Sequence, residues 1–178
     1  QETENAKKGL PSGITVKVNS LVDPKIIELL YEASKAGVRV QLIVRGICCL
    51  IPGIEGVSEN ITVMSIVGQL LEHSRIFRFE NAGNPRIYMG SADWMPRNLD
   101  RRVELVFPIE DETQKARAFG ILDTMLSDTT NARFMQSDTS YEHVDLRGKK
   151  KISSQLTFYH EAQARLKELQ SIEKDSVL

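Results

Sequence analysis

The feature that most constrains the fold is a strand–helix–strand succession close to the amino terminus. Residues 14–19 alternate between apolar and polar side chains, which is typical of a β-strand. Asp23 and Pro24 are the residue types of a helix N-cap and a first helical position, and Gly37 ends the helical pattern that follows. Residues 38–44 are apolar enough for a buried parallel strand. This succession predicts an α/β fold.

The chain as a whole divides into three predicted segments. Residues 1–13 predict the end of an upstream helix and a linker, residues 14–148 one α/β domain, and residues 149–178 a docking helix or tail. Within the domain, the patterns predict a long loop at 47–60, strands at 61–67 and 103–107, a helical turn at 68–72, a turn or short helix at 94–98, an amphipathic helix at 111–126 and a polar, irregular stretch at 131–148.

The charge balance decides where an anion could bind. The 178 residues have a formal net charge of −1, which excludes a generally basic nucleic-acid coat, and we expect no nucleic-acid partner. An anion site must therefore be local. A local cluster of positive charge is supplied by the arginines at positions 75, 78, 86, 97, 101 and 102, although a run of arginines can also be a solvated surface.

Two further patterns bear on the compartment. No apolar run reaches the roughly 18 residues of a membrane span, and no signal peptide precedes the first strand, so we expect no membrane span. Cys48 and Cys49 are adjacent, so they form neither an ordinary disulfide framework nor a CxxC metal pair. Reduced thiols suit the cytoplasm, where we expect the protein to be located.

Residues 71–102 hold an unusual density of groups that handle phosphate. His73 and Arg75 precede an alternating run at 76–79, and strand periodicity would put both side chains on one face. A Gly/Asn/Pro turn and a returning strand at 86–90 predict a hairpin that brings Ser91 and Asp93 back towards His73. Histidine can attack phosphorus or carry a proton, and arginine neutralises phosphoryl oxygens. We interpret this stretch as half of a phosphoryl-transfer site.

Arg45 is the strongest binding candidate outside the hairpin. It ends the strand at 38–44 on the edge where α/β sheets usually place ligands, and Gly46 lets a phosphate approach the backbone. The alternative is an arginine that pairs with a nearby carboxylate. Tyr88 and Trp94 could stack on a base, but core packing is the favoured interpretation.

The motif His73-x-Arg75, then Glu80 and Gly90-Ser91, resembles a degenerate HxKxxxxD…GS motif of the phospholipase D-like superfamily, with Arg for Lys and Glu for Asp. Four blocks within residues 5–141, LVDPKIIELLYEASKAGV, LIVRGICCLIPGIEGVSENI, LLEHSRIFRFENAG and GSADWMPRNLDRRVE, resemble the carboxy-terminal catalytic domain of the bacterial polyphosphate kinases that work through a phosphohistidine. The implied fold is α/β, a phospholipase D-like mixed or parallel sheet flanked by helices.

The resemblance also implies an activity and a site. The family reversibly transfers the ATP γ-phosphate to inorganic polyphosphate, and its phosphorylated histidine lies in the preceding domain, which is absent here. His73 matches the second histidine and is given a supporting catalytic role. Arg45 matches an arginine that contacts the nucleotide, and Arg102 a phosphate-contacting arginine, with the choice between Arg101 and Arg102 left open. Position alone, and not the resemblance, suggests Glu80, Ser91 and Asp93 as orienting residues, with Glu80 acting on His73 or a nearby arginine.

The same resemblance implies cofactors and partners. ATP, ADP and polyphosphate are the expected substrates, and Mg²⁺ is the expected cofactor, with its ligands in the absent domain and no metal site in this chain. The preceding domain of the same polypeptide is an expected partner, and the complete enzyme is expected to be a homo-oligomer. This chain alone should bind phosphates but turn over poorly or not at all.

Two alternatives stay open on the sequence. A phosphodiesterase or phosphatidyl transferase could dimerise to bring two copies of His73 together. A non-enzymatic polyanion-binding module would bind many polyanions alike and would be indifferent to His73→Ala.

Overall fold

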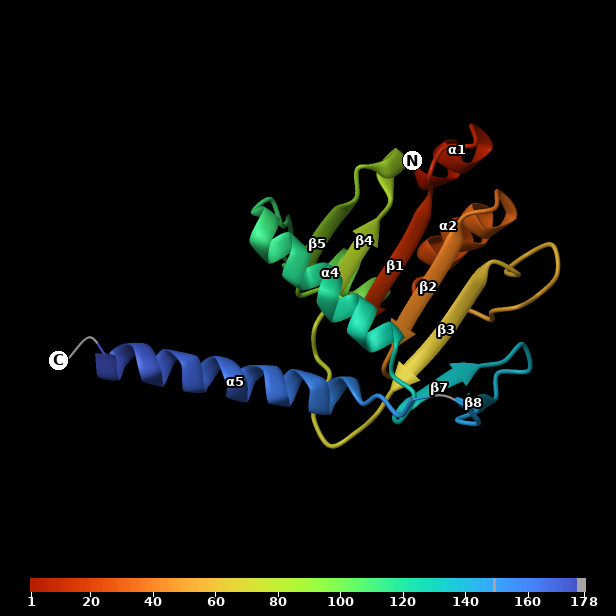
Figure 1. Cartoon of the computed structure of the whole chain (residues 1–178). Helices are drawn as coiled ribbons and strands as arrows, with labels where there is room; N and C mark the ends of the chain where they lie inside the picture. Colours follow the sequence, from red (N-terminus) through yellow and green to blue (C-terminus); the bar gives the residue numbers. More distant parts are fainter. Residues whose placement is uncertain (149, 176–178) are drawn as a thin grey trace.

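The computed structural model describes residues 1–148 and 150–175, which form a mixed sheet flanked by helices (Figure 1). The strand order is β6-β5-β4-β1-β2-β3-β7-β8. The elements are α1 (Glu2–Lys7), β1 (Gly13–Val18), α2 (Pro24–Lys35), β2 (Arg39–Val44), β3 (Ile61–Ile66), β4 (Ile76–Phe79), the short 3₁₀ helix η1 (Asn81–Gly83), β5 (Arg86–Gly90), α3 (Pro96–Arg101), β6 (Val106–Pro108), α4 (Glu112–Leu126), β7 (Ala132–Met135), β8 (Tyr141–His143) and α5 (Ser154–Asp175).

The centre of the sheet is parallel, and both of its faces are covered. β1 pairs with β2, and β2 with β3, in parallel register, and the outer strands pair antiparallel. Neighbouring residues of β2 point to opposite faces, so Leu42 belongs to the core beneath α2 and Ile43 to the core beneath α4. Parallel central strands with helices on both faces confirm the predicted α/β class. Burial on both faces also explains why these strands are nearly continuous apolar runs.

The helix boundaries follow from their capping residues. The Asp23 carboxylate accepts a hydrogen bond from the Ile26 N–H at 3.0 Å, and Pro24 occupies the first turn of α2, as predicted. Asp111 caps α4 in the same way through the Gln114 N–H at 2.9 Å. At the end of α1, Gly9 adopts a φ of +68° and the Leu10 N–H donates to the Asn5 carbonyl at 2.9 Å, which is a Schellman-type ending.

Three sequence expectations are wrong. Residues 68–70 form bends, and residues 71–72 have no regular secondary structure, so the expected helical turn is absent. The stretch 131–148 is not irregular, because β7 pairs antiparallel with β3 and β8 pairs with β7. The strand expected at 103–107 begins only at Val106, and it includes Pro108 because β6 is an edge strand, where proline is tolerated.

The buried carboxylate of Asp128 organises the return from α4 to β7. Its Oδ1 accepts the Asn131 N–H at 2.7 Å, and its Oδ2 accepts both the backbone N–H and the hydroxyl of Ser154 at 2.7 Å. One side chain therefore fixes the entry to β7 and the start of α5.

Beyond its first turns, α5 leaves the sheet and projects outward (Figure 1). Leu156, Leu166, Leu169 and Ile172 on this helix are all more than half exposed. The docking role predicted for this segment stays a prediction. In the described part of the chain, every helix is too short or too polar to cross a membrane.

Candidate functional site

Four polar residues meet at one edge of the sheet. β4 runs antiparallel to β1, and β5 antiparallel to β4, so the carboxyl ends of β1, β2 and β5 share an edge with the amino end of β4. Asn19 follows β1, Arg45 follows β2, Arg75 precedes β4 and Asp93 lies shortly after β5. We call this edge, defined by these four residues, the carboxyl edge. Such edges are where α/β sheets place ligands.

Arg75 and Asp93 form a largely buried ion pair at the carboxyl edge. The Arg75 Nη2 lies 2.8 Å from Asp93 Oδ2, its Nε donates to Asp93 Oδ1 at 3.2 Å, and the two side chains are 13% and 11% exposed. Burial alone would raise the pKa of Asp93, but hydrogen bonds from Arg75 and the Asn19 backbone hold that pKa below its usual value. The hairpin therefore delivers Asp93 to Arg75, and it gives Arg75 an internal partner.

Asn19 connects this pair to Arg45. Its backbone N–H donates to Asp93 Oδ1 at 2.7 Å, and its Oδ1 accepts from Arg45 Nε at 3.1 Å. The alternative in which Arg45 pairs with a carboxylate is therefore not observed. Among the described residues, the two terminal nitrogens of Arg45 have no hydrogen-bond partner, and the buried Nδ2 of Asn19 has none either. These donors are available to an anion.

His73 lies in irregular backbone and not on a strand. β4 begins at Ile76, so strand periodicity does not align His73 with Arg75, contrary to expectation. The His73 side chain is exposed, and its carbonyl accepts a hydrogen bond from Arg75 Nη1 at 3.0 Å. No described residue hydrogen-bonds the imidazole, so this is not a histidine tied into a structural network.

Lys17 supports the His73 segment, and its role was not predicted from the sequence. It is 1% exposed, and its Nζ donates to the carbonyls of Glu72 and Ser74, each at 3.2 Å, on either side of His73. Burial lowers the pKa of Lys17 to about 8, partly offset by the charge of Glu72. A lysine in an alternating strand pattern reads as a solvated residue, so the pattern gave no signal for this role.

Ser91 and the region of Arg102 form one end of the carboxyl edge. The Ser91 hydroxyl donates to Glu104 and accepts from the Leu105 N–H at 3.0 Å. Hydrogen bonds from Ser91 and Asn98 lower the pKa of Glu104. Arg101 ends α3, Arg102 follows in extended backbone, and both are exposed, so the choice between them stays open.

Glu80 lies away from this edge. It follows β4, whereas His73 precedes it, and its carboxylate pairs with Arg78 at 2.8 Å. Of the two roles considered for Glu80, orienting a nearby arginine fits this placement, and orienting His73 does not. The described residues contain no cluster of His, Cys, Asp and Glu suited to a metal ion.

The loop at 47–60 packs against the end of the parallel sheet. The Cys49 N–H donates to the Leu21 carbonyl at 2.8 Å, the Ile51 N–H donates to the Tyr31 hydroxyl at 2.9 Å, and Leu50 is fully buried. Cys48 and Cys49 are free thiols, and burial raises the pKa of Cys48 to about 11. The thiol of Cys48 is therefore protonated and unreactive at neutral pH.

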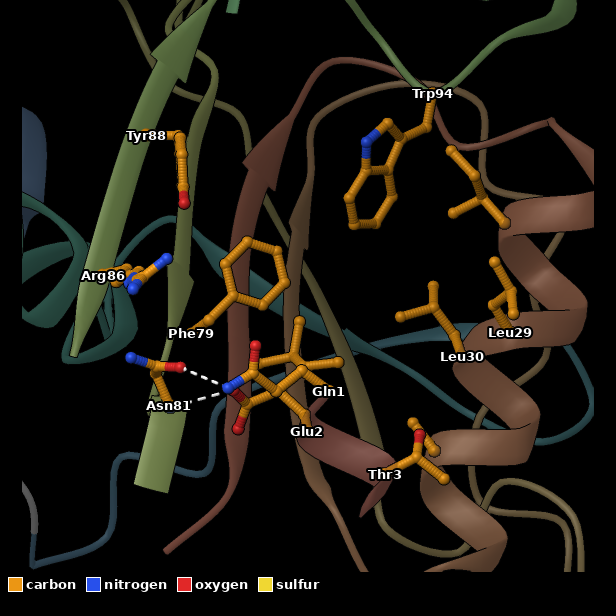
Figure 2. A pocket seen from close by; sticks show the side chains of 13 residues that line it. Gln1, Glu2, Thr3, Leu29, Leu30, Phe79, Asn81, Arg86, Tyr88 and Trp94 are labelled. Carbon is orange, nitrogen blue, oxygen red and sulfur yellow. Dashed lines mark hydrogen bonds between the residues drawn. The ribbon is translucent and has the colours of Figure 1, made fainter. Parts of the chain in front are cut away.

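A cavity of about 500 Å³ lies between α2 and the β4–β5 hairpin (Figure 2). Tyr88, Trp94 and Leu30 line it, and Gln1 donates to Asn81 Oδ1 at 2.8 Å at its rim. The Trp94 ring stacks on Phe77 with ring centroids 5.6 Å apart, in keeping with the favoured core-packing interpretation. The walls are mainly apolar. Of the arginines considered for an anion site only Arg86 lies here, whereas His73, Arg45, Arg75 and Arg102 do not line this cavity.

The chain matches a known family over most of its length. The family model described as polyphosphate kinase C-terminal domain 2 matches residues 1–155. A polyphosphate kinase of Lactiplantibacillus plantarum is 54% identical over 162 residues, which are 91% of this chain and 23% of the relative. The polyphosphate kinase of Escherichia coli K12 is 46% identical over 159 residues, 89% of this chain and 23% of the relative. The chain thus spans about a quarter of the length of these relatives.

Solved structures agree with this match. The crystal structure of polyphosphate kinase from Porphyromonas gingivalis aligns with a TM-score of 0.88 and 38% identity, covering 92% of this chain and 25% of that one. Nuc from Salmonella typhimurium, a phospholipase D family member, aligns with a TM-score of 0.51 and 15% identity, covering 76% of this chain and 89% of that one. The second likeness concerns the fold alone and confirms the phospholipase D-like architecture.

Proposed function

The chain belongs to the polyphosphate kinase C-terminal domain 2 family, and from this membership we propose that it forms one half of a site that reversibly transfers the γ-phosphate of ATP to inorganic polyphosphate. One observation carries the proposal. The same sheet edge holds an exposed His73 and an Arg45 whose terminal nitrogens have no protein partner among the described residues. Phosphoryl transfer needs charge neutralisation and positioning more than it needs covalent chemistry from the protein.

Each edge residue has a proposed role. Arg45 and Arg102 bind phosphate oxygens, because no carboxylate of the described residues lies within ion-pair distance of either guanidinium, although the charge of Glu104 acts on Arg102. His73 stabilises the transferring phosphoryl group or exchanges a proton with it. Arg75 was predicted to bind phosphate directly, but its donors face Asp93 and the His73 carbonyl, so we now assign it to holding the His73 segment. The Ser91 hydroxyl is likewise engaged within the protein, since it donates a hydrogen bond to Glu104.

The nucleophile and the metal ligands are proposed to lie outside this chain. A phosphohistidine in the preceding domain would carry the phosphoryl group. Mg²⁺ prefers carboxylate and water oxygens, and the carboxylates of Asp93 and Glu104 at this edge are already engaged by protein donors. The residues present therefore do not fit a protein-held Mg²⁺ site. Homo-oligomerisation of the complete enzyme stays a prediction, and the free thiols fit a reducing cytoplasm.

Calorimetric titration tests this assignment directly. Mg·ATP and polyphosphate would be titrated into the wild-type chain and into Arg45→Ala and His73→Ala, with the exposed His160→Ala as the control. We expect saturable binding that Arg45→Ala weakens about tenfold or more, equivalent to about 1.4 kcal/mol. Parallel titrations of Arg101→Ala and Arg102→Ala decide which of the two contacts phosphate.

Turnover separates the proposal from its rivals. The wild-type chain alone should not make polyphosphate from ATP, since it lacks the proposed nucleophile. Hydrolysis of a generic phosphodiester that disappears in His73→Ala would instead favour a phosphodiesterase. Equal binding of unrelated polyanions, unchanged by His73→Ala and Arg45→Ala, would favour a passive binding module and contradict the proposal.

A further inference from the structure

A second arginine shares a cavity with Arg45. This cavity has a volume of about 210 Å³, and Arg45, Ser65, Asn131, Arg133 and Tyr141 are among its lining residues. None of the described residues that line it carries a carboxylate. It is therefore a polar hollow with two cationic side chains and no acidic counterpart.

The sheet topology brings the two arginines together. β7 pairs antiparallel with β3, and Arg133 stands opposite Ser65 in the register. The Ser65 hydroxyl donates to the Arg45 carbonyl at 3.1 Å, so the same residue is next to both arginines. Arg133 is exposed, and no described residue pairs with its guanidinium.

Two guanidinium groups in a hollow without carboxylates repel each other, and a bound anion relieves that repulsion. Arginine is suited to phosphate because its planar fork offers paired N–H donors. Tyr141 adds a further donor, because a tyrosine hydroxyl is protonated at neutral pH. The lining thus has the composition of a phosphate subsite.

We propose that the cavity between Arg45 and Arg133 binds a phosphate group of a bound phosphate chain, on the side of Arg45 that faces away from His73. This inference rests on the proposed function, because it extends the phosphate path of that site. β7 lies four strands from β4 in the sheet order, which is roughly 19 Å at about 4.8 Å per strand. An extended chain of phosphates at His73 can reach such a subsite, so inorganic polyphosphate is the favoured ligand and the phosphates of ATP are the alternative source.

The test is a calorimetric comparison of Arg133→Gln with the wild type, using polyphosphate of defined length and Mg·ATP as separate ligands. We expect Arg133→Gln to weaken polyphosphate binding about five- to tenfold, and Arg133→Lys, which keeps the charge, to restore most of the affinity. If Arg133→Gln lowers the affinity for polyphosphate alone, the subsite binds a phosphate of the polyphosphate chain. A loss for both ligands places it on a phosphate position that the two share.

Arg39→Gln is the matched control. Arg39 is also exposed and begins β2 at the opposite edge of the sheet, so its replacement removes the same charge without touching the cavity. Thermal unfolding confirms that each variant is folded. If Arg45→Gln weakens binding but Arg133→Gln behaves like Arg39→Gln, the subsite is wrong and the proposed function stands. If the wild type binds neither ligand, or Arg45→Gln has no effect, the proposed function fails and the subsite fails with it.

Discussion

The Asp93 carboxylate links two segments of the carboxyl edge, because Arg75 and the backbone N–H of Asn19 both donate hydrogen bonds to it. Asp93→Asn would leave the largely buried guanidinium of Arg75 without a counter-charge. We expect this change to lower the free energy of unfolding by about 3 kcal/mol at pH 7. Urea denaturation measures the difference.

The lowered pKa of Asp93 gives this effect a pH dependence. A carboxyl group with a lowered pKa in the folded state contributes stability above its unfolded pKa of about 3.9 and loses it as the pH falls through the folded value. The difference between wild type and Asp93→Asn should therefore shrink below about pH 4. The exposed Asp100→Asn serves as the control, and a difference that grows in acid would contradict the ion pair.

Lys17 should show a linkage of the same sign as Asp93, but at alkaline pH, because its pKa is also lowered in the folded state. Between about pH 8 and the ordinary lysine value of 10.5, the unfolded chain keeps a proton that folded Lys17 has lost. The unfolded state then binds more protons, so the stability of the wild type relative to Lys17→Met should rise between pH 7.5 and pH 9.5. Urea denaturation at the two pH values tests this, with the exposed Lys25→Met as the control. A relative stability that falls with pH would contradict the assignment.

The candidate residues that stand out by chemical type were predictable, and those that act through burial were not. Arg45 could be placed because it ends an apolar strand. The hairpin pattern predicted that Asp93 returns towards His73, and in the structure it pairs with Arg75, two residues further on. Lys17 and Asn19 lie in one alternating strand pattern that does not reveal which polar side chains the fold will bury. Their roles depend on segments more than 50 residues away in sequence.

The β5–β6 contact explains the glycine in the Gly90-Ser91 pair. A Cβ at position 90 would lie 2.5 Å from the Leu105 carbonyl oxygen and 3.3 Å from the Val106 Cα, both of which are backbone atoms. Gly90→Ala must therefore push β6 away, and we expect a loss of about 2 kcal/mol in the free energy of unfolding. Gly120→Ala in α4, where a Cβ meets nothing within 4 Å, should be neutral or stabilising by about 0.5–1 kcal/mol. Equal effects in urea denaturation would contradict this account.

The elements that the sequence predicted well have strong periodicity and capping residues. α2 and α4 begin beside the aspartates that cap them, and the buried β2 and β3 are apolar runs. The β7–β8 hairpin was missed because its strands are only four and three residues long, and because β8 is exposed along its whole length. Its position depends on pairing with β3 and on the buried carboxylate of Asp128, neither of which is a local signal.

For the whole molecule, the sheet order turns a chain of net charge −1 into one with a locally cationic edge. Arg102, Arg45 and Arg133 belong to segments that meet at or near this edge, although the sequence separates them by 31 to 88 residues. The carboxylates within this region are engaged by internal partners, as Asp93 and Glu104 show. Anion binding at this edge therefore does not need a basic protein.

Amide chemical-shift mapping during titration with polyphosphate tests this central claim most directly. The account predicts saturable shifts that concentrate at the carboxyl edge, around Asn19, Arg45 and the His73–Arg75 segment, and that leave the apolar cavity of Figure 2 near Phe79 and Arg86 unchanged. Shifts confined to that apolar cavity, or no saturable shifts at all, would contradict the claim that the carboxyl edge is the phosphate site.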